Sequence, residues 1–334
     1  ANDELARLEV RDVGKVFSEA VSGDVPSGTD AFDYFAACIT AQNGDFNKWD
    51  KAIGYSVRIP LGVCAGIGAW NYPMQIACWK SAPALAAGNS FILKPSEETP
   101  FVAQKVAELL QAAGLPDGLF QIIHGDQDIG AAICTHPGIA KISLTGGVET
   151  GRLIMAQSAH SLKKITLVLG GKSPLLVFDD CDFNLGVQTA LDANFYTAGE
   201  VCSNATRVFV QRSIADDFIA ALIAKAEAIR VGDPMAKGIQ MGALISAHHL
   251  AKVLNYVEIG VGEGATIATG GKQLRPKGFE NGFFMQPTIL TNCKDNMRVV
   301  REEIFGPVMS VLIFDDEDEA VQRANDTDFG LGAG

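Results

Sequence analysis

The sequence has little positive charge and no long apolar segment, and each absence removes a class of protein. Its 334 residues contain 27 lysines and arginines against 39 aspartates and glutamates, which gives a formal net charge of −12. The basic residues gather in no stripe or run, so nucleic acid is not an expected partner. No apolar run reaches the roughly 18 residues needed to cross a bilayer, so the sequence predicts no membrane span.

The seven cysteines are scattered, odd in number and without a C-x-x-C pair. Such usage predicts a reducing cytoplasm, mostly structural thiols and no zinc site. The five histidines have no metal-ligand spacing, and His248-His249 is predicted to be a surface pair on a helix. The polar, acidic first residues argue against a secretory signal on this chain. We therefore expect a cytoplasmic protein that binds no metal.

What the chain does have is a long alternation of strand-like and helical segments. Its length and its 48% hydrophobic content predict two domains with a large core. Strands are predicted at residues 62–69, 90–93, 119–123, 140–144 and 164–169, and helices at 74–87, 100–113, 126–134 and 148–160. A second series is predicted at 175–178, 182–196, 207–211, 214–230, 246–262, 288–290, 308–314 and 317–325. This alternation indicates α/β architecture with parallel sheets, which bind ligands beyond the carboxyl ends of their strands.

The two ends of the chain follow a different pattern. A helix is predicted over residues 1–20, and the Gly, Pro and Ser residues at 22–29 are expected to break it. Asp30 is then expected to cap a second helix that runs to about residue 41. Residues 51–60 are predicted to form an extended arm. The sequence stops in a turn-like run of glycines, so we expect both ends to be incomplete.

Cys202 lies in a turn between a predicted helix and a predicted strand, and the other candidate site residues are considered in relation to it. A helical run ends at Tyr196, small residues lead to Cys202, and a strand-like run begins at residue 207. On composition alone this cysteine is more often a buried thiol than a nucleophile, because most free cysteines act as small core hydrophobes.

Two turns are candidates for holding a nucleotide. Thr145-Gly146-Gly147 joins a strand to a helix, where backbone N–H groups can face a pyrophosphate. The usual G-x-G-x-x-G pattern is absent, so a plain turn is an equal alternative. Lys94 and Glu97 follow a strand end and can hold ribose hydroxyls, although a solvated loop is the commoner meaning of such a pair.

Together these stretches resemble the aldehyde dehydrogenase superfamily, over essentially the whole chain. Six motifs carry the resemblance in the family's order and approximate spacing: Ala69-Trp70-Asn71-Tyr72-Pro73, Lys94-Pro95-Ser96-Glu97, Thr145-Gly146-Gly147, Leu169-Gly170-Gly171-Lys172, Gly199-Glu200-Val201-Cys202 and Glu302-Glu303-Ile304-Phe305-Gly306-Pro307-Val308. The resemblance implies a Rossmann-like NAD-binding domain (1–36 and 61–170), an oligomerisation arm (37–60) and a catalytic domain (171–334). It also implies a homo-oligomer.

The resemblance assigns roles to single residues. Cys202 would attack the aldehyde carbonyl, while the Asn71 amide and the Cys202 N–H would stabilise the oxyanion. The cofactor would be NAD, because a Glu beside the adenosine ribose repels the 2′-phosphate of NADP. The implied cofactor residues are Trp70, Lys94, Glu97, Thr145, Gly146, Gly147, Leu169, Glu303 and Phe305.

One position departs from the family pattern. The motif Leu169-Gly170-Gly171-Lys172 is normally preceded by a Glu, the general base that activates water for thioester hydrolysis, and here that position is Val168. Valine can neither take nor give a proton, so deacylation is predicted to be slow. Glu200, two residues before the nucleophile, is not expected to replace the missing base.

Within the superfamily the chain is most similar to the dehydrogenases of betaine aldehyde and 4-trimethylaminobutyraldehyde. The resemblance therefore implies that Tyr72, Trp79 and Tyr196 line a trimethylammonium site, where aromatic rings attract the cation. An ordinary aromatic-walled tunnel is the alternative. Two further readings stay open. One is a catalytically silent homologue that retains cofactor binding, and the other is a thioester enzyme that uses another acyl acceptor.

Overall fold

The computed structural model describes residues 2–334, which divide into two compact units. The first unit contains residues 2–12 and Ala20–Leu169, and the second contains Val13–Glu19 and Gly170–Gly334. The division after Leu169 lies one residue from the predicted domain boundary. Residues 13–19 differ from the prediction, because they pack with the second unit.

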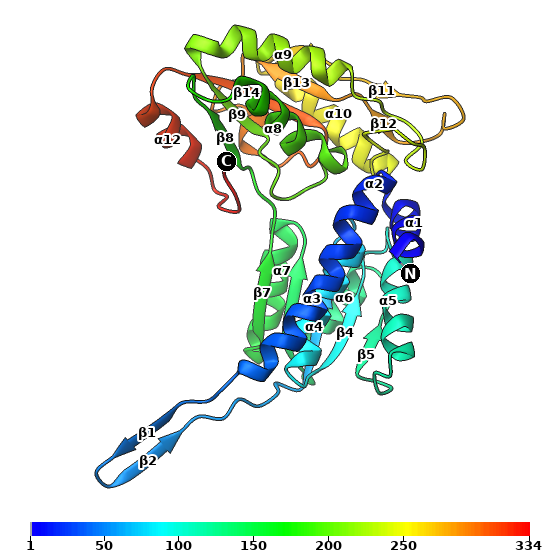
Figure 1. Cartoon of the computed structure of the whole chain (residues 1–334), viewed down its shortest axis with the longest axis vertical. Helices are drawn as coiled ribbons and strands as arrows, with labels where there is room; N and C mark the ends of the chain where they lie inside the picture. Colours follow the sequence, from blue (N-terminus) through cyan, green and yellow to red (C-terminus); the bar gives the residue numbers. More distant parts are fainter. Residues whose placement is uncertain (1) are drawn as a thin grey trace. The chain divides into compact units, whose positions relative to one another are not determined.

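The first unit is built on a five-stranded parallel sheet with the order β5-β4-β3-β6-β7 (Figure 1). Its strands are β3 (Val63–Ile67), β4 (Ser90–Lys94), β5 (Phe120–Ile122), β6 (Ile139–Thr145) and β7 (Lys164–Val168). The connecting helices are α4 (Pro73–Ala86), α5 (Phe101–Ala112), α6 (Gln127–Thr135) and α7 (Val148–Ser158). The strand order reverses between β3 and β6, and ligands bind parallel sheets at such switch points. The predicted α/β fold class is confirmed.

The N-terminal helices differ from the prediction. Helix α1 (Asn2–Val13) is followed by α2 (Phe17–Glu19), the π-helical η1 (Ala20–Asp24), α3 (Val25–Cys38) and η2 (Ile39–Ala41). The predicted break at residues 22–29 is wrong, because Pro26 stands in the first turn of α3, where its missing N–H is not needed. Asp30 is accordingly an interior residue of α3 and not its cap.

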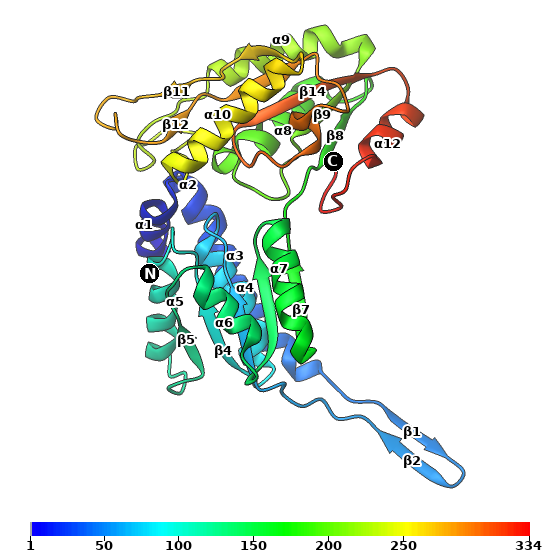
Figure 2. The same ribbon diagram turned by 180° about the vertical axis from the view of Figure 1, so that it is seen from behind.

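A hairpin projects from the first unit between α3 and β3 (Figures 1 and 2). It consists of β1 (Phe46–Trp49) and β2 (Ala52–Tyr55), paired antiparallel. Its large apolar side chains are exposed, with Phe46 at 67% and Tyr55 at 74%. The predicted extended arm at residues 51–60 is thus the second half of a two-stranded arm.

The second unit has its own five-stranded sheet with the order β10-β13-β14-β9-β8. The strands are β8 (Pro174–Val177), β9 (Arg207–Gln211), β10 (Thr266–Thr269), β13 (Thr288–Thr291) and β14 (Val308–Phe314). The helices are α8 (Phe183–Phe195), α9 (Ala215–Glu227), α10 (Ala247–Gly262), α11 (Arg298–Arg301) and α12 (Glu317–Asn325). All pairs are parallel except β10–β13. Sequence analysis missed β10 and the short ribbon β11 (Gln273–Leu274) and β12 (Phe284–Met285), because such short edge strands have little apolar patterning.

Three short 3-10 turns lie between the longer elements: η3 (Ala159–Ser161), η4 (Tyr196–Gly199) and η5 (Arg212–Ile214). The core of the second unit includes Val208, Phe209 and Phe314, which are fully buried. No helix within residues 2–334 is long and apolar enough to cross a bilayer.

Candidate active site

Three loops of the second unit meet because of the order of its strands. The neighbouring parallel strands β8, β9 and β14 have their amino ends at one edge of the sheet. Gly171 precedes β8 by three residues, Cys202 precedes β9 by five and Glu303 precedes β14 by five. Segments far apart in the sequence are thereby brought to one place.

The two glycines at this edge allow the close approach of Cys202 and Glu303. The backbone N–H of Gly171 donates to Oε1 of Glu303 at 3.1 Å. A Cβ on Gly170 would lie 2.0 Å from Oε2 of Glu303, and a Cβ on Gly171 would lie 2.6 Å from the carbonyl oxygen of Cys202. Any side chain at either position would therefore displace the nucleophile candidate or the carboxylate.

The surroundings raise the pKa of the Cys202 thiol. The main cause is burial, and the negative charge of Glu303 adds to it. Hydrogen bonds from the backbone N–H groups of Cys202 and Ser203 act in the opposite direction. Burial also raises the pKa of Glu303, although the Gly171 N–H and the charges of Lys252 and Lys172 oppose it. The thiol is therefore mostly protonated at neutral pH in this state of the protein.

Replacing Glu303 with glutamine should make Cys202 more reactive at moderately alkaline pH. The substitution removes a negative charge that disfavours the thiolate, so the alkylation midpoint moves to lower pH. We expect iodoacetamide to modify Cys202 about 3- to 10-fold faster at pH 8, which corresponds to half to one pKa unit. Peptide mass spectrometry across pH 6–10 measures this.

Glu302→Gln is the matched control, because Glu302 is the adjacent carboxylate and it pairs with Arg298 at 2.7 Å. It should leave the profile of Cys202 unchanged. Equal profiles for the native protein and Glu303→Gln would contradict the placement of Glu303 beside the thiol.

Phe305 is held in a strained conformation by His249. Its φ is 62°, a left-handed value that is unusual for a residue with a side chain. Nε2 of His249 donates to the Phe305 carbonyl oxygen at 2.6 Å. Burial is the main cause that lowers the pKa of His249 to about 4, so the ring is neutral at pH 7. The prediction of a surface histidine pair is wrong for His249, because this position of α10 faces the core.

Glu200 faces the interior of the second unit. Its Oε1 accepts a hydrogen bond from the Ile245 N–H at 3.1 Å. Burial raises its pKa well above the usual range. The expectation that Glu200 does not act as a general base stays a prediction.

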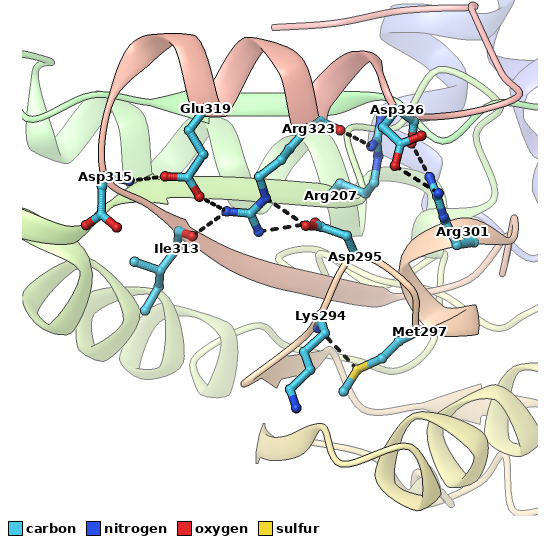
Figure 3. A network of polar contacts seen from close by, with 10 residues as sticks. All are labelled: Arg207, Lys294, Asp295, Met297, Arg301, Ile313, Asp315, Glu319, Arg323 and Asp326. Atoms are coloured by element: carbon cyan, nitrogen blue, oxygen red, sulfur yellow. Dashed lines mark hydrogen bonds and ion pairs between the residues drawn. The ribbon is translucent and has the colours of Figure 1, made fainter.

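A polar network connects α12 with the start of β9 and with Asp295 (Figure 3). The buried Arg207, at the start of β9, donates to the carbonyl oxygens of Lys172 at 2.8 Å and Ala324 at 2.7 Å. Arg323 of α12 pairs with Asp295 and with Glu319. Through Arg207, these bonds connect α12 to the backbone of Lys172, the residue that follows Gly170–Gly171.

Lys172 is a fully buried lysine that sequence analysis did not single out. Burial is the main cause that lowers its pKa to about 7, and the nearby charge of Arg207 acts in the same direction. Among the described residues its Nζ has no hydrogen-bond partner. The motif around Lys172 was the only sequence signal, and it gave no sign of the burial.

In the first unit, Lys94 and Glu97 lie beside a cavity at the carboxyl ends of β4 and β5. Nζ of Lys94 is 3.2 Å from Oε2 of Glu97, and Lys94 is buried. The cavity has a volume of about 490 Å³, and its lining includes Glu97, Phe101 and His124. Volumes of roughly 300–1,000 Å³ are typical of small-molecule sites. Lys94 is buried while the Glu97 side chain is 60% exposed, so the nucleotide-binding role of this pair stays a prediction.

Thr145 ends β6, and Gly147 is the N-cap residue of α7. Nothing lies within 4 Å of a Cβ built on Gly147, so the start of α7 has open space. Free N–H groups at a helix start favour anions. On the other side of the switch point, Trp70 and Asn71 follow β3, and Asn71 is buried.

Val168 is the last residue of β7 and lies at the carboxyl end of the same sheet. Its backbone oxygen accepts from the Gly146 N–H at 3.0 Å. Its side chain is 38% exposed, so it does not fill the core. Leu169, the next residue, ends the first unit and approaches Gly151 of α7.

Trp79 lies on α4 at the border of a second cavity of the first unit. Its indole N–H donates to the Ser27 carbonyl oxygen at 3.1 Å, and its side chain is 51% exposed. The cavity has a volume of about 650 Å³, and Asp30 and Tyr34 of α3 also line it. Asp30 and Tyr34 were placed in a predicted helix at residues 30–41, but they were not predicted to line a site.

Tyr72 and Tyr196, the other predicted substrate residues, belong to different units. Tyr72 is the N-cap residue of α4. Tyr196 begins η4 in the second unit and is 38% exposed. Lys80, one residue after Trp79, was not predicted. It is buried, donates to Oγ of Ser143 at 3.0 Å, and has a pKa lowered to about 7, mainly by burial.

The sequence of the chain matches one protein family throughout. Residues 1–334 match the family described as "Aldehyde dehydrogenase family". The chain belongs to the aldehyde dehydrogenase family. A betaine aldehyde dehydrogenase of Vibrio vulnificus (strain YJ016) is 53% identical and is covered over 69% of its length, with 100% of this chain matched. One from Brucella ovis is 52% identical, with 68% of its length covered and 100% of this chain matched.

Solved aldehyde dehydrogenase structures have the same fold. A betaine aldehyde dehydrogenase of Staphylococcus aureus in complex with NAD+ has a TM-score of 0.97 at 40% identity, over 99% of this chain and 66% of that chain. A gamma-glutamyl-gamma-aminobutyraldehyde dehydrogenase of Burkholderia cenocepacia J2315 has a TM-score of 0.95 at 42% identity, over 99% of this chain and 67% of that chain. The chain thus spans about two thirds of the length of these relatives.

Within residues 2–334 no group of three or more His, Cys, Asp or Glu side chains is arranged to hold a metal ion.

Proposed function

We propose that the protein oxidises an aldehyde with NAD through a thioester on Cys202. The observation that carries the proposal is the meeting of Cys202, the Gly170–Gly171 turn and Glu303 at one edge of the second sheet. A partly exposed free thiol beside a close backbone approach is suited to covalent catalysis, in which the thiolate is the nucleophile.

The chemistry follows from the groups that face the thiol. The Cys202 thiol loses its proton to solvent, the resulting thiolate attacks the carbonyl carbon, and the carbonyl oxygen becomes an oxyanion. By the family pattern, the Cys202 N–H and the Asn71 amide would donate to that oxygen, and each such donor contributes about 3–4 kcal/mol in comparable sites. NAD, when bound, accepts the hydride. Water must then release the acid, and Val168 supplies no base for that step.

The residues of the first unit fit NAD. The cavity beside Lys94 and Glu97 accommodates a ribose and its base, and the open start of α7 at Gly147 suits a pyrophosphate. The carboxylate of Glu97 would repel the 2′-phosphate of NADP. Thr145 and Gly146 precede the helix, and Glu303 and Phe305 would hold the nicotinamide ribose. Trp70 and Leu169 complete the proposed set.

We propose a trimethylammonium aldehyde as substrate, such as betaine aldehyde. Trp79 and Tyr34 offer exposed aromatic faces, and Asp30 adds a negative charge in the same cavity. Aromatic faces and a carboxylate together favour a cation that sheds water easily. Tyr72 and Tyr196 belong to the proposed aromatic set, and two relatives named betaine aldehyde dehydrogenase support the choice.

Comparing two aldehydes tests the substrate class. In a Val168→Glu variant, which should turn over repeatedly, kcat/KM for betaine aldehyde should exceed that for propanal by about tenfold or more, because cation–π contacts contribute roughly 0.5–2 kcal/mol each. Adding Asp30→Asn should lower the value for betaine aldehyde and leave propanal unchanged. Equal values for the two aldehydes in Val168→Glu would remove the trimethylammonium substrate from the proposal.

A second candidate function rests on Val168. A protein that binds NAD and forms the thioester, but releases it slowly, is functionally a silent homologue.

In either case the exposed apolar residues of the β1–β2 hairpin suit pairing with another copy of the chain, which supports a homo-oligomer.

A further inference from the structure

The loop that leads to Cys202 is built from strained residues. Thr197 (φ 47°, ψ 43°) and Ala198 (φ 50°, ψ 29°) are both left-handed, and Gly199 follows with φ 75°. Two consecutive residues with side chains rarely adopt this conformation, and they keep it only where their surroundings hold them. Gly199, the last left-handed residue of this loop, precedes Cys202 by three residues.

Glu19 holds the first of these residues. The Thr197 N–H donates to both carboxylate oxygens of Glu19, at 3.2 and 3.3 Å, and the Thr197 hydroxyl donates to Oε2 at 3.1 Å. Glu19 ends α2, in the segment Val13–Glu19 that packs with the second unit. A carboxylate 178 residues away in sequence thus receives two donors of one strained residue.

The far side of the loop is also fixed. A Cβ on Gly199 would lie 2.3 Å from the carbonyl carbon and oxygen of Gly306, in the segment that carries Glu303. Glu200 accepts from the Ile245 N–H. The loop is therefore held between Glu19 on one side and Gly306 on the other.

Glu19 also borders a cavity at the start of the loop. The cavity has a volume of about 270 Å³, and its lining includes Glu19, Asp192 and Tyr196. Glu19 and Tyr196, the neighbour of Thr197 in the sequence, thus border open space, whereas Thr197 and Ala198 themselves are buried.

We propose that Glu19 is a positioning residue for the nucleophile, which holds Thr197 and Ala198 in their left-handed conformation and so keeps Cys202 beside Gly171 and Glu303. The proposal rests on the role of Cys202 given above. Glu19 acts through the loop and does not touch the reacting atoms. Its loss leaves the thiol present but misplaced.

The test follows the reactivity of Cys202 itself, so it does not depend on turnover. Glu19→Ala should increase solvent access to the thiol and separate it from Glu303, since both burial and that charge raise its pKa. We expect at least threefold faster alkylation of Cys202 by iodoacetamide at pH 7.5, with the alkylation midpoint shifted to lower pH. The first turnover of NADH formation should be at least tenfold slower.

Glu19→Gln keeps one acceptor oxygen for the Thr197 N–H, so it should lie between the native protein and Glu19→Ala in both measurements. It also serves if Glu19→Ala does not fold. Asp216→Asn, which changes an exposed carboxylate of α9, should match the native protein.

An unchanged pH profile and an unchanged first turnover in Glu19→Ala, with or without a lower melting temperature, would overturn the proposal, because they would leave Glu19 with a purely structural role. If Glu19→Ala does not fold, the same result in Glu19→Gln would overturn it. A separate result would show that the proposed function itself is wrong: in that case the Cys202→Ser variant would keep the native rate of NADH formation.

Discussion

Val168→Glu is expected to raise the steady-state rate of aldehyde oxidation by about 10²- to 10⁴-fold, because a positioned general base typically contributes that much. The native protein should form one NADH per Cys202 in a rapid burst and then continue very slowly. Val168 ends β7 with a side chain that is 38% exposed, so a glutamate fits without displacing the core. Stopped-flow absorbance of NADH resolves the burst from the steady state.

Val168→Gln is the matched control for this prediction. It has nearly the shape of the glutamate but no basic group, so it should keep the slow steady state. Rapid multiple turnover by the native protein would show that another group activates water. Equal rates for the Glu and Gln variants would show that the gain comes from shape and not from proton transfer.

Cys202→Ser is expected to abolish both the burst and the steady state, by about 10⁴-fold or more, as the loss of a catalytic nucleophile does elsewhere. A hydroxyl in this partly exposed place is far harder to ionise than a thiol, so the first bond to the aldehyde does not form. NAD affinity should stay within about threefold, because the proposed adenosine site lies in the first unit. NADH formation in a single turnover and NAD titration by fluorescence measure the two effects.

Cys181→Ser is the control, because Cys181 is another partly exposed free thiol of the second unit. It should keep native activity. Residual NADH formation by Cys202→Ser above about one hundredth of the native burst would remove Cys202 from the nucleophile's role.

The fold was largely predictable, since most of its strands and helices have strong patterns. Apolar runs with turn residues between them located β3, β4, β6 and β7 within one or two residues. The N-terminal region was mispredicted for a local reason. Pro26 and Gly28 look like helix breakers in sequence, but Pro26 is tolerated in the first turn of α3, and Gly28 lets that helix approach Cys78 of α4.

Part of the candidate site was also predictable, and part was not. Cys202 and Glu303 were nominated from short motifs, and the structure brings them together at the Gly170–Gly171 turn, which was quoted in a motif but not nominated as a site. The roles of Asn71, Tyr72 and Tyr196 stay predictions. His249, Lys172 and Lys80 were missed or misread, because the burial of a polar side chain depends on which face of an element meets the core.

The sequence by itself determined the family and the α/β architecture, because both follow from local motifs and their order. The absence of a general base at Val168 stays a prediction from those motifs. Only the tertiary structure decided which groups surround Cys202. Glu303 lies beside the thiol because β9 and β14 are neighbours in the sheet. Glu19 accepts hydrogen bonds from Thr197 because residues 13–19 pack with the second unit, although in the sequence they lie between two segments of the first unit. Contacts between residues 100 or more positions apart follow from strand order and packing, which no local pattern specifies.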